Sequence, residues 1–291
     1  MNIPHTITYN TLKLLKKYFS IISIDKRYKI AMKLAGLLYH FTNIRKKQAR
    51  ENIKIAFPSW SNQKVEITLK KNYQFFCYNL VQFVAFPKSW EKIKITVTGK
   101  EILNEFLDLG KGVIFISGHF GAWEILGKWV GEYVDLFTGV AQIQKNKGAH
   151  KFFIEQRELP GTNHIFKKEP LEKMYDILIK NGLLGLVSDQ DAKQKGIFVK
   201  FFNKLASTPK GAAMFHLNSN APVLFGVCIR KNLRSYNIEF SSVDTSRKSL
   251  EHITQSYTSL LENSIRKYPE QYFWFHRRWK TRPKGGSTTK S

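Results

Sequence analysis

Residues 111–124, KGVIFISGHFGAWE, constrain the fold of this chain more than any other stretch. Residues 113–116 are apolar and mostly β-branched or aromatic, which is typical of a strand buried on both faces. Ser117 and Gly118 interrupt that pattern, and from Gly121 to Val130 the apolar residues recur at roughly helical spacing. The pattern predicts a strand that leads through a tight turn into a helix.

His119 falls on this turn, where a side chain is presented at the carboxyl edge of a sheet. Gly118 and Gly121 permit close backbone approach on either side of it. The start of the following helix leaves free N–H groups, which favour developing negative charge. Glu124 follows five residues after His119. We therefore predict a general-base site, with His119 as the base, Glu124 as the carboxylate that orients it, and amides near Gly118 to Gly121 as oxyanion donors.

The spacing alone does not establish this site. A histidine followed five residues later by an acid also occurs at His150 and at His164, and composition predicts about 0.6 such pairs by chance. The ordinary alternative for each pair is a helix cap or a surface ion pair. Only His119 follows a predicted buried strand and lies between glycines, so its context distinguishes it from the other two.

Strands and helices alternate through the middle two thirds of the chain. Predicted strands cover residues 94–97, 113–116, 135–142, 164–166, 183–187, 197–202, 223–229 and 236–240. Predicted helices cover residues 45–57, 62–85, 99–109, 121–133, 147–159, 171–181, 209–219 and 248–266, with Ala206 to Gly211 opening the helix at 209. This order predicts an α/β fold, in which a mixed, mostly parallel sheet is covered by helices and active residues lie beyond carboxyl strand ends.

The two ends of the chain differ from the middle. Residues 1–44 are predicted to form basic amphipathic helices that lie on an anionic membrane surface, because lysines interrupt every apolar run before it is long enough to span. The alternative is that these helices only cover the core. Residues 45–280 form the predicted catalytic domain, and residues 281–291 a disordered tail. No cleavable signal peptide is expected.

The formal net charge of +25 indicates an anionic partner, such as nucleic acid, anionic lipid, a phosphorylated substrate or an acidic carrier protein. The two cysteines, Cys77 and Cys228, lie in apolar runs and fit no metal or redox spacing. No nucleotide-binding glycine motif or zinc-ligand cluster occurs, so we expect neither a metal site nor a cofactor.

Several further blocks share an order and spacing with the His119 turn. Ser188-Asp-Gln-Asp191 closes the strand 183–187, residues 196–203 and 206–211 follow, a later strand ends at Arg230, and residues 270–280 read EQYFWFHRRWK. Over about residues 45–280, these blocks resemble the lipid A biosynthesis acyltransferase family, a branch of the wider glycerolipid acyltransferase group. Many members carry an N-terminal spanning helix that this chain lacks in any clear form, and the acid of the His-x4-acid pair is here Glu.

The resemblance implies an acyltransferase sandwich and an O-acyltransferase that moves a fatty acyl chain from a thioester to a hydroxyl of a lipid A precursor or a related glycolipid or lysolipid. It makes His119 and Glu124 the catalytic pair, and Arg157 the residue for an anionic substrate group. Asp189 and Gln190 match the acidic block after the strand at 183–187. The remaining substrate-binding candidates are Asp191, Gly121 and Arg230, since each lies at a predicted strand end or turn.

The implied donor is acyl carrier protein or acyl-CoA, and the implied location is the cytoplasmic face of the inner membrane, as a peripheral or monotopic protein. Trp123, Phe198 and Phe201 are candidates to line an acyl groove, although core packing is the commoner role for such residues. A basic nucleic-acid-binding protein is the alternative, because residues 273–279 combine aromatic and basic side chains; no recognised nucleic-acid-binding module supports it. A lipid esterase is disfavoured because the chain lacks a nucleophile elbow.

Overall fold

A computed structural model describes residues 2–41, 43, 45–158 and 161–283. The α-helices are α1 (Ile3–Ile21), α2 (Ile24–Phe41), α3 (Lys46–Ala56), α4 (Asn62–Val84), α5 (Lys100–Asp108), α6 (Trp123–Tyr133), α7 (Lys147–Glu158), α8 (Glu172–Ile179), α9 (Gly211–Ser219) and α10 (Leu250–Lys267). The strands are β1 (Lys94–Thr98), β2 (Val113–Ser117), β3 (Phe137–Ala141), β4 (Asn163–Phe166), β5 (Leu183–Val187), β6 (Ile197–Phe201), β7 (Lys204–Thr208), β8 (Val223–Arg230) and β9 (Ser235–Ser242). Two short 3-10 turns are η1 (Lys193–Lys195) and η2 (Pro269–Gln271).

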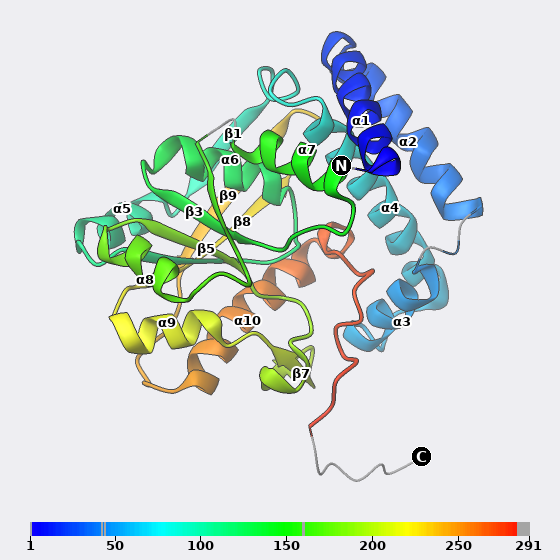
Figure 1. Cartoon of the computed structure of the whole chain (residues 1–291). Helices are drawn as coiled ribbons and strands as arrows, with labels where there is room; N and C mark the ends of the chain where they lie inside the picture. The colour runs from blue at the N-terminus through cyan, green and yellow to red at the C-terminus, as the bar shows by residue number, and fades with distance from the viewer. Residues whose placement is uncertain (1, 42, 44, 159–160, 284–291) are drawn as a thin grey trace.

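Seven strands form one sheet in the order β1-β9-β8-β2-β5-β3-β4. All neighbouring strands pair in parallel except β8 and β9, which form an antiparallel pair. The long crossover connections of a parallel sheet carry helices, which here cover both faces (Figure 1). The expected α/β fold with a mixed, mostly parallel sheet is confirmed.

β2 shows why this sheet lies in the centre of the protein. All five of its residues are buried. Val113 and Phe115 belong to a hydrophobic cluster with residues of α5 and α6, whereas Ile114 and Ile116 belong to a second cluster with α4, α9 and α10. Successive side chains of a strand point to opposite faces. The uninterrupted apolar run is therefore the consequence of burial on both sides.

One local prediction was wrong. Residues 206–208 do not open a helix; they belong to β7, which pairs with β6 as an antiparallel hairpin outside the main sheet. The two residues of the connecting turn, Phe202 and Asn203, both have positive φ angles, which is the backbone of a type I′ turn. Such turns normally contain Asn-Gly or Asp-Gly, and Phe-Asn gives no comparable sequence signal. α9 starts only at Gly211.

The N-terminal helices pack on the remainder of the chain. α2 packs along α4 and α1 along α7 (Figure 1), and Phe19, Ala31 and Ala35 belong to the same hydrophobic cluster as the sheet residues. Within the described residues, no helix is both long enough and apolar enough to cross a membrane.

The start of the predicted tail is partly described. The Thr281 hydroxyl donates a hydrogen bond to Asp191, and the Arg282 carbonyl accepts one from Gln194. The remainder of that predicted segment, 284–291, lies outside the described residues.

Residues 268–283, the C-terminal segment, run across the protein between the sheet and α3 (Figure 1). Its backbone meets the turn after β2, because the Phe273 N–H donates to the His119 carbonyl at 2.9 Å. Two buried amide side chains hold the segment: Asn72 donates to the carbonyls of Glu270 and Tyr272, and Asn52 to those of residues 274 and 276. Residues far apart in sequence thus fix the backbone behind His119.

Replacing Asn72 by leucine tests this attachment. Asn72→Leu keeps the volume but removes the donor of the Glu270 carbonyl and one of the two donors of the Tyr272 carbonyl, so we expect the free energy of unfolding to fall by about 1–3 kcal/mol. Denaturant unfolding measures the change. Asn62→Leu, at an exposed position of the same helix, is the control, and equal losses in the two variants would contradict the assignment.

Candidate active site

His119 and Asp189 meet because β2 and β5 are parallel neighbours in register. Ser117 pairs with Val187 at the end of the two strands, and each of the two functional residues follows two positions later. Nδ1 of His119 lies 2.7 Å from Oδ1 of Asp189. The Asp189 side chain is 3% exposed, whereas that of His119 is 30% exposed. The carboxylate therefore lies behind an imidazole that substrate can reach.

The charges of this pair stabilise each other. Burial alone would lower the pKa of His119, but the charge and hydrogen bond of Asp189, with the nearby Glu124, outweigh it and raise the pKa above its ordinary value. Burial would raise the pKa of the Asp189 carboxyl, but the imidazole holds it below its usual value. Asp189 is therefore ionised, and its charge favours the protonated form of His119.

Glu124 does not make the contact expected of it. Its carboxylate accepts two hydrogen bonds from Arg157, at 3.0 and 2.6 Å, and one from the Trp123 indole at 3.0 Å. Among the described residues, no hydrogen bond joins Glu124 to His119. The prediction that Glu124 orients the imidazole was thus wrong in geometry, since Asp189 occupies that place. Arg157, expected to be free for an anionic substrate group, already has a carboxylate of the chain as its partner.

Two cavities lie near the imidazole, and His119 itself lines the first of them. This cavity, of about 660 Å³, has a mixed lining of polar residues that include His164, Lys167, Gln190 and Asp191 and apolar residues that include Phe115, Leu126 and Val140. The second, of about 450 Å³, is lined largely by apolar side chains that include Phe76, Leu80, Phe83, Phe153 and Phe273. Trp123, Glu124 and Arg157 line both cavities, so the ion pair lies where the mixed cavity and the apolar cavity meet.

The other predicted site residues divide into two groups. Gln190 and Asp191 line the first cavity, and the Gln190 amide comes within 3.4 Å of Nδ1 of His119. Arg230 lines neither cavity, because its guanidinium packs on the rings of Phe75 and Tyr78. The structure therefore does not bring Arg230 to the cavities beside His119, and its role in substrate binding stays a prediction.

Gly121 has a role in the backbone and lines neither cavity. Its φ is +63°, and a β-carbon there would lie 2.0 Å from the Cys228 carbonyl oxygen. Because Gly121 has no side chain, the turn can pack directly against β8. The expected oxyanion donors are also occupied: the amides of Phe120, Gly121 and Ala122 donate to carbonyls of Gly118, Gln271 and Cys228. The prediction of free amides at this turn was wrong for these three residues.

The aromatic candidates for an acyl groove are likewise divided. Trp123 lines both cavities, and its ring centroid lies 5.5 Å from that of His119. Phe198 and Phe201 line neither, and Phe201 is fully buried and stacked on Trp279. Among the described residues, no group of three or more His, Cys, Asp or Glu side chains could hold a metal ion.

Comparison with known proteins gives the family. Residues 9–281 match the family described as bacterial lipid A biosynthesis acyltransferase. The chain belongs to this family. It is 24% identical over 267 residues to a lipid A biosynthesis palmitoleoyltransferase of Escherichia coli, which covers 89% of this chain and 86% of that protein. It is also 24% identical over 268 residues to the lipid A biosynthesis lauroyltransferase of the same organism, with the same coverage.

A second kind of relative matches a shorter part. A phosphatidylinositol mannoside acyltransferase of Mycolicibacterium smegmatis is 27% identical over 180 residues, which is 60% of this chain and 58% of that protein. The match therefore spans under two thirds of that relative. The relatives are thus named for two different glycolipids, lipid A and phosphatidylinositol mannoside.

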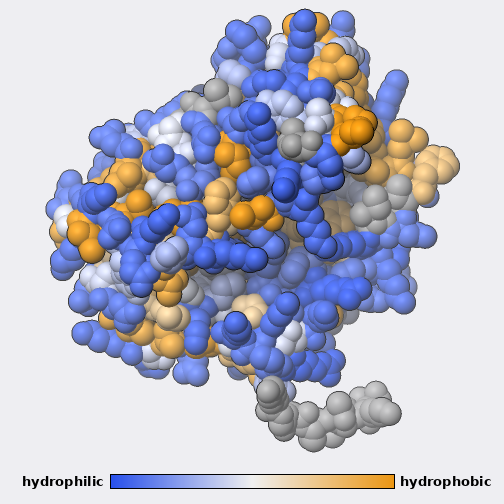
Figure 2. Space-filling model, viewed as in Figure 1, coloured by the Kyte–Doolittle hydropathy of each residue, from blue (hydrophilic) through white to orange (hydrophobic). Residues whose placement is uncertain are grey.

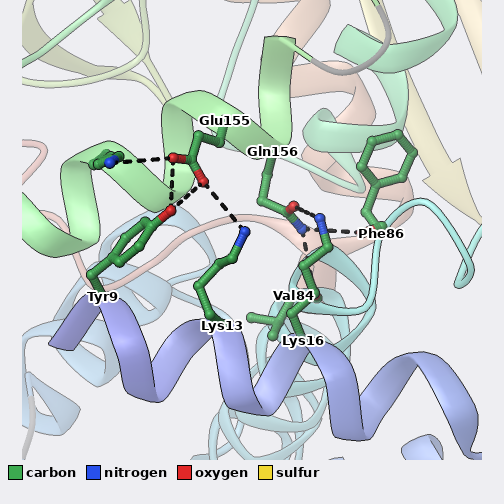
Figure 3. Close-up of polar contacts among 8 residues, drawn as sticks. Tyr9, Lys13, Lys16, Val84, Phe86, Glu155 and Gln156 are labelled. Atoms are coloured by element: carbon green, nitrogen blue, oxygen red, sulfur yellow. Dashed lines mark hydrogen bonds and ion pairs between the residues drawn. The ribbon is translucent and has the colours of Figure 1, made fainter. Parts of the chain in front are cut away.

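In this member of the lipid A acyltransferase family, the helix that carries Arg157 is fixed to α1 (Figure 3). The Gln156 side chain donates to the carbonyls of residues 83, 84 and 86, and accepts a hydrogen bond from Lys16 at 2.5 Å. The Tyr9 hydroxyl donates to Glu155, the residue before Gln156, and the Lys13 ammonium lies 3.9 Å from the same carboxylate. The N-terminal helix therefore helps to place the end of α7.

Gln156→Leu should weaken this junction. The buried amide is replaced by an apolar group of similar size, which removes the Gln156 donor from three carbonyls and the acceptor from the Lys16 ammonium. The carbonyl of residue 83 keeps the bond from the Phe86 N–H. We expect the free energy of unfolding to fall by about 1–3 kcal/mol, measured by denaturant unfolding. Gln63→Leu, at an exposed position of α4, should change it far less; unchanged stability of Gln156→Leu would show that the junction contributes nothing.

Proposed function

We propose that this protein transfers a fatty acyl chain from an acyl thioester to a hydroxyl of a lipid A precursor or a related glycolipid. The observation that carries the proposal is the His119–Asp189 pair, a partly exposed imidazole backed by a buried carboxylate at the edge of a large cavity. A base held in this way suits proton removal from an alcohol. The family match supports the lipid class of the acceptor.

The hydrogen bond to Asp189 fixes the proton of His119 on Nδ1 and leaves Nε2 as the basic nitrogen. Nε2 takes the proton of the acceptor hydroxyl while its oxygen attacks the thioester carbonyl. The tetrahedral intermediate then collapses, the carbon–sulfur bond breaks, and the imidazolium returns the proton to the leaving thiolate. An ester and a thiol result, without a covalent acyl-enzyme. The Gln190 amide, beside the imidazole, is our candidate donor to the oxyanion.

The two cavities suit the two kinds of group in the reaction. We place the acyl chain in the apolar cavity, and the acceptor's polar head group in the cavity that contains Lys167, Gln190 and Asp191. The Glu124–Arg157 pair shapes the wall between them. In this proposal Glu124 acts by holding Arg157 in the wall, and its charge also adds to the raised pKa of His119.

We further propose that the protein lies on the cytoplasmic face of the inner membrane through α1. Ile3, Ile7, Leu14, Tyr18 and Ile21 are all exposed and recur at helical spacing. Tyr9, Lys13 and Lys16, which contact α7, lie on the other side of the same helix (Figure 3). Hydrophobic residues among hydrophilic ones are visible at this end of the molecule (Figure 2). Such a stripe fits the interface of an anionic bilayer.

The nucleic-acid alternative finds no support in the C-terminal segment. Trp274 is fully buried, and Phe273 and Phe275 pack on each other and on Phe76. Side chains packed in this way cannot stack on bases.

The direct test is transfer by the purified protein from acyl carrier protein or acyl-CoA thioesters to a lipid A precursor, with mass spectrometry of the lipid product. His119→Ala should lower the rate by about 10²–10⁴-fold, the usual contribution of a positioned base. His252→Ala is the matched control, because His252 lies 2.9 Å from Asp244 and lines neither cavity. Near-normal transfer by His119→Ala would exclude the mechanism.

The pH dependence of kcat/KM tests the role of Asp189. Because the pKa of His119 is raised above its ordinary value of about 6.5, the inactive imidazolium persists to higher pH, and activity should rise as the pH passes through the raised pKa. In Asp189→Ala, only Glu124 would oppose the lowering of the His119 pKa by burial. The pKa should therefore fall, so the acidic limb of the pH profile should move to lower pH while the maximum rate falls. An unmoved limb would show that Asp189 does not control the base.

A further inference from the structure

A groove of about 1110 Å³ lies beside the catalytic cavity and is rich in basic side chains. Five exposed basic residues line it: Arg45, Lys47, Lys193, Arg277 and Lys280. They come from the start of α3, from η1 and from the C-terminal segment. No ion pair within the described part of the chain involves any of the five, and only two carboxylates, Glu51 and Asp191, face them in the groove. The groove is therefore suited to an anion.

Asp191 connects this groove to the catalytic cavity, because it lines both. Its carboxylate accepts hydrogen bonds from the Thr281 hydroxyl and the Lys193 amide, and its own N–H donates to His276. These bonds fix the carboxylate as part of the wall. Asp191 follows Asp189, the partner of His119, by two residues. A ligand that extends from the groove past Asp191 would therefore reach the cavity that His119 lines.

The groove is also held in shape by its backbone. Arg45 and Lys193 have φ angles of 48° and 57°, in the left-handed region that residues with a β-carbon adopt at a cost of roughly 1–2 kcal/mol. Hydrogen bonds hold the η1 turn, from the Ser207 hydroxyl to the Lys193 carbonyl and from Gln194 to the Arg282 carbonyl. Strained residues held by their surroundings concentrate at binding sites. Here two of them present basic side chains to one groove.

We propose that this groove binds the phosphate end of the thioester donor. The inference rests on the proposed acyl transfer. Donors of either kind, carrier protein or coenzyme, attach the acyl group to a pantetheine arm whose far end carries a phosphate. With the phosphate in the groove, the arm passes Asp191 and brings the thioester to His119, while the acyl chain enters the apolar cavity. The groove lies between α3 and the C-terminal segment, away from α1 (Figure 1), which suits a water-soluble donor.

The decisive experiment compares two donors that differ only in this phosphate, an acyl-phosphopantetheine and the corresponding acyl-pantetheine. In the unchanged protein, the phosphate should lower KM by at least about tenfold, as expected for charge-assisted hydrogen bonds. In the double variant Arg277→Glu, Lys280→Glu, the two donors should give equal KM values. The KM for acyl-pantetheine and the KM for the lipid acceptor should stay unchanged, which also shows that the variant is folded.

Lys54→Glu is the control, because Lys54 is exposed on α3 and lines none of the three cavities. It should keep the full phosphate preference. Acyl-CoA and acyl carrier protein should both lose affinity in the double variant, since both carry the same phosphate. A preference that survives the charge reversal, a loss confined to the carrier protein, or a raised KM for the acceptor instead of the donor would each overturn the assignment. Absence of transfer from every donor by the unchanged protein would instead refute the proposed function.

Discussion

The parallel pairing of β2 with β5 is the constraint on which the site depends. Each strand ends at the same level of the sheet, so the residues two positions beyond Ser117 and Val187 come together as His119 and Asp189. A shift of one residue in this register would direct one of the two side chains to the opposite face. Val113 and Phe115 pack into one cluster and Ile114 and Ile116 into the other, so such a shift would exchange the two pairs of side chains and disrupt the close packing on both faces. Packing of the sheet thus fixes the distance between the His119 ring and the Asp189 carboxylate.

Local sequence patterns predicted much of this structure. The apolar run of β2 and the glycine-flanked turn identified His119, and the end of β5 identified the segment that contains Asp189. The pairing of those two residues could not be derived, because strand order is a property of the whole sheet and not of any one segment. The His-x4-acid spacing pointed instead to Glu124, the acid close in sequence. None of the three such pairs forms a direct hydrogen bond among the described residues: Glu155 accepts from Tyr9, and Glu169 from Lys173.

Long-range packing also explains the other differences between prediction and structure. Arg230 ends a strand, as a substrate-binding residue often does, but rings of Phe75 and Tyr78 on α4 cover it. The amides after His119 resemble a free helix start, yet the carbonyls of Gln271 and Cys228 occupy two of them. In each case the partner comes from a segment more than a hundred residues away. Sequence periodicity predicts which face of an element is buried, but not which polar group lies opposite.

The structure assigns different work to two carboxylates that lie near one imidazole. Asp189 is buried and touches the ring, so its negative charge sets the proton position and stabilises the imidazolium. Glu124 is neutralised by two hydrogen bonds from Arg157, which leaves it unable to compete for the same ring nitrogen. A second unpaired carboxylate at this distance would raise the pKa of His119 further and leave less of the basic form at neutral pH. Arg157 is therefore the partner of Glu124, and α7, through its contacts with α1, holds the guanidinium in place.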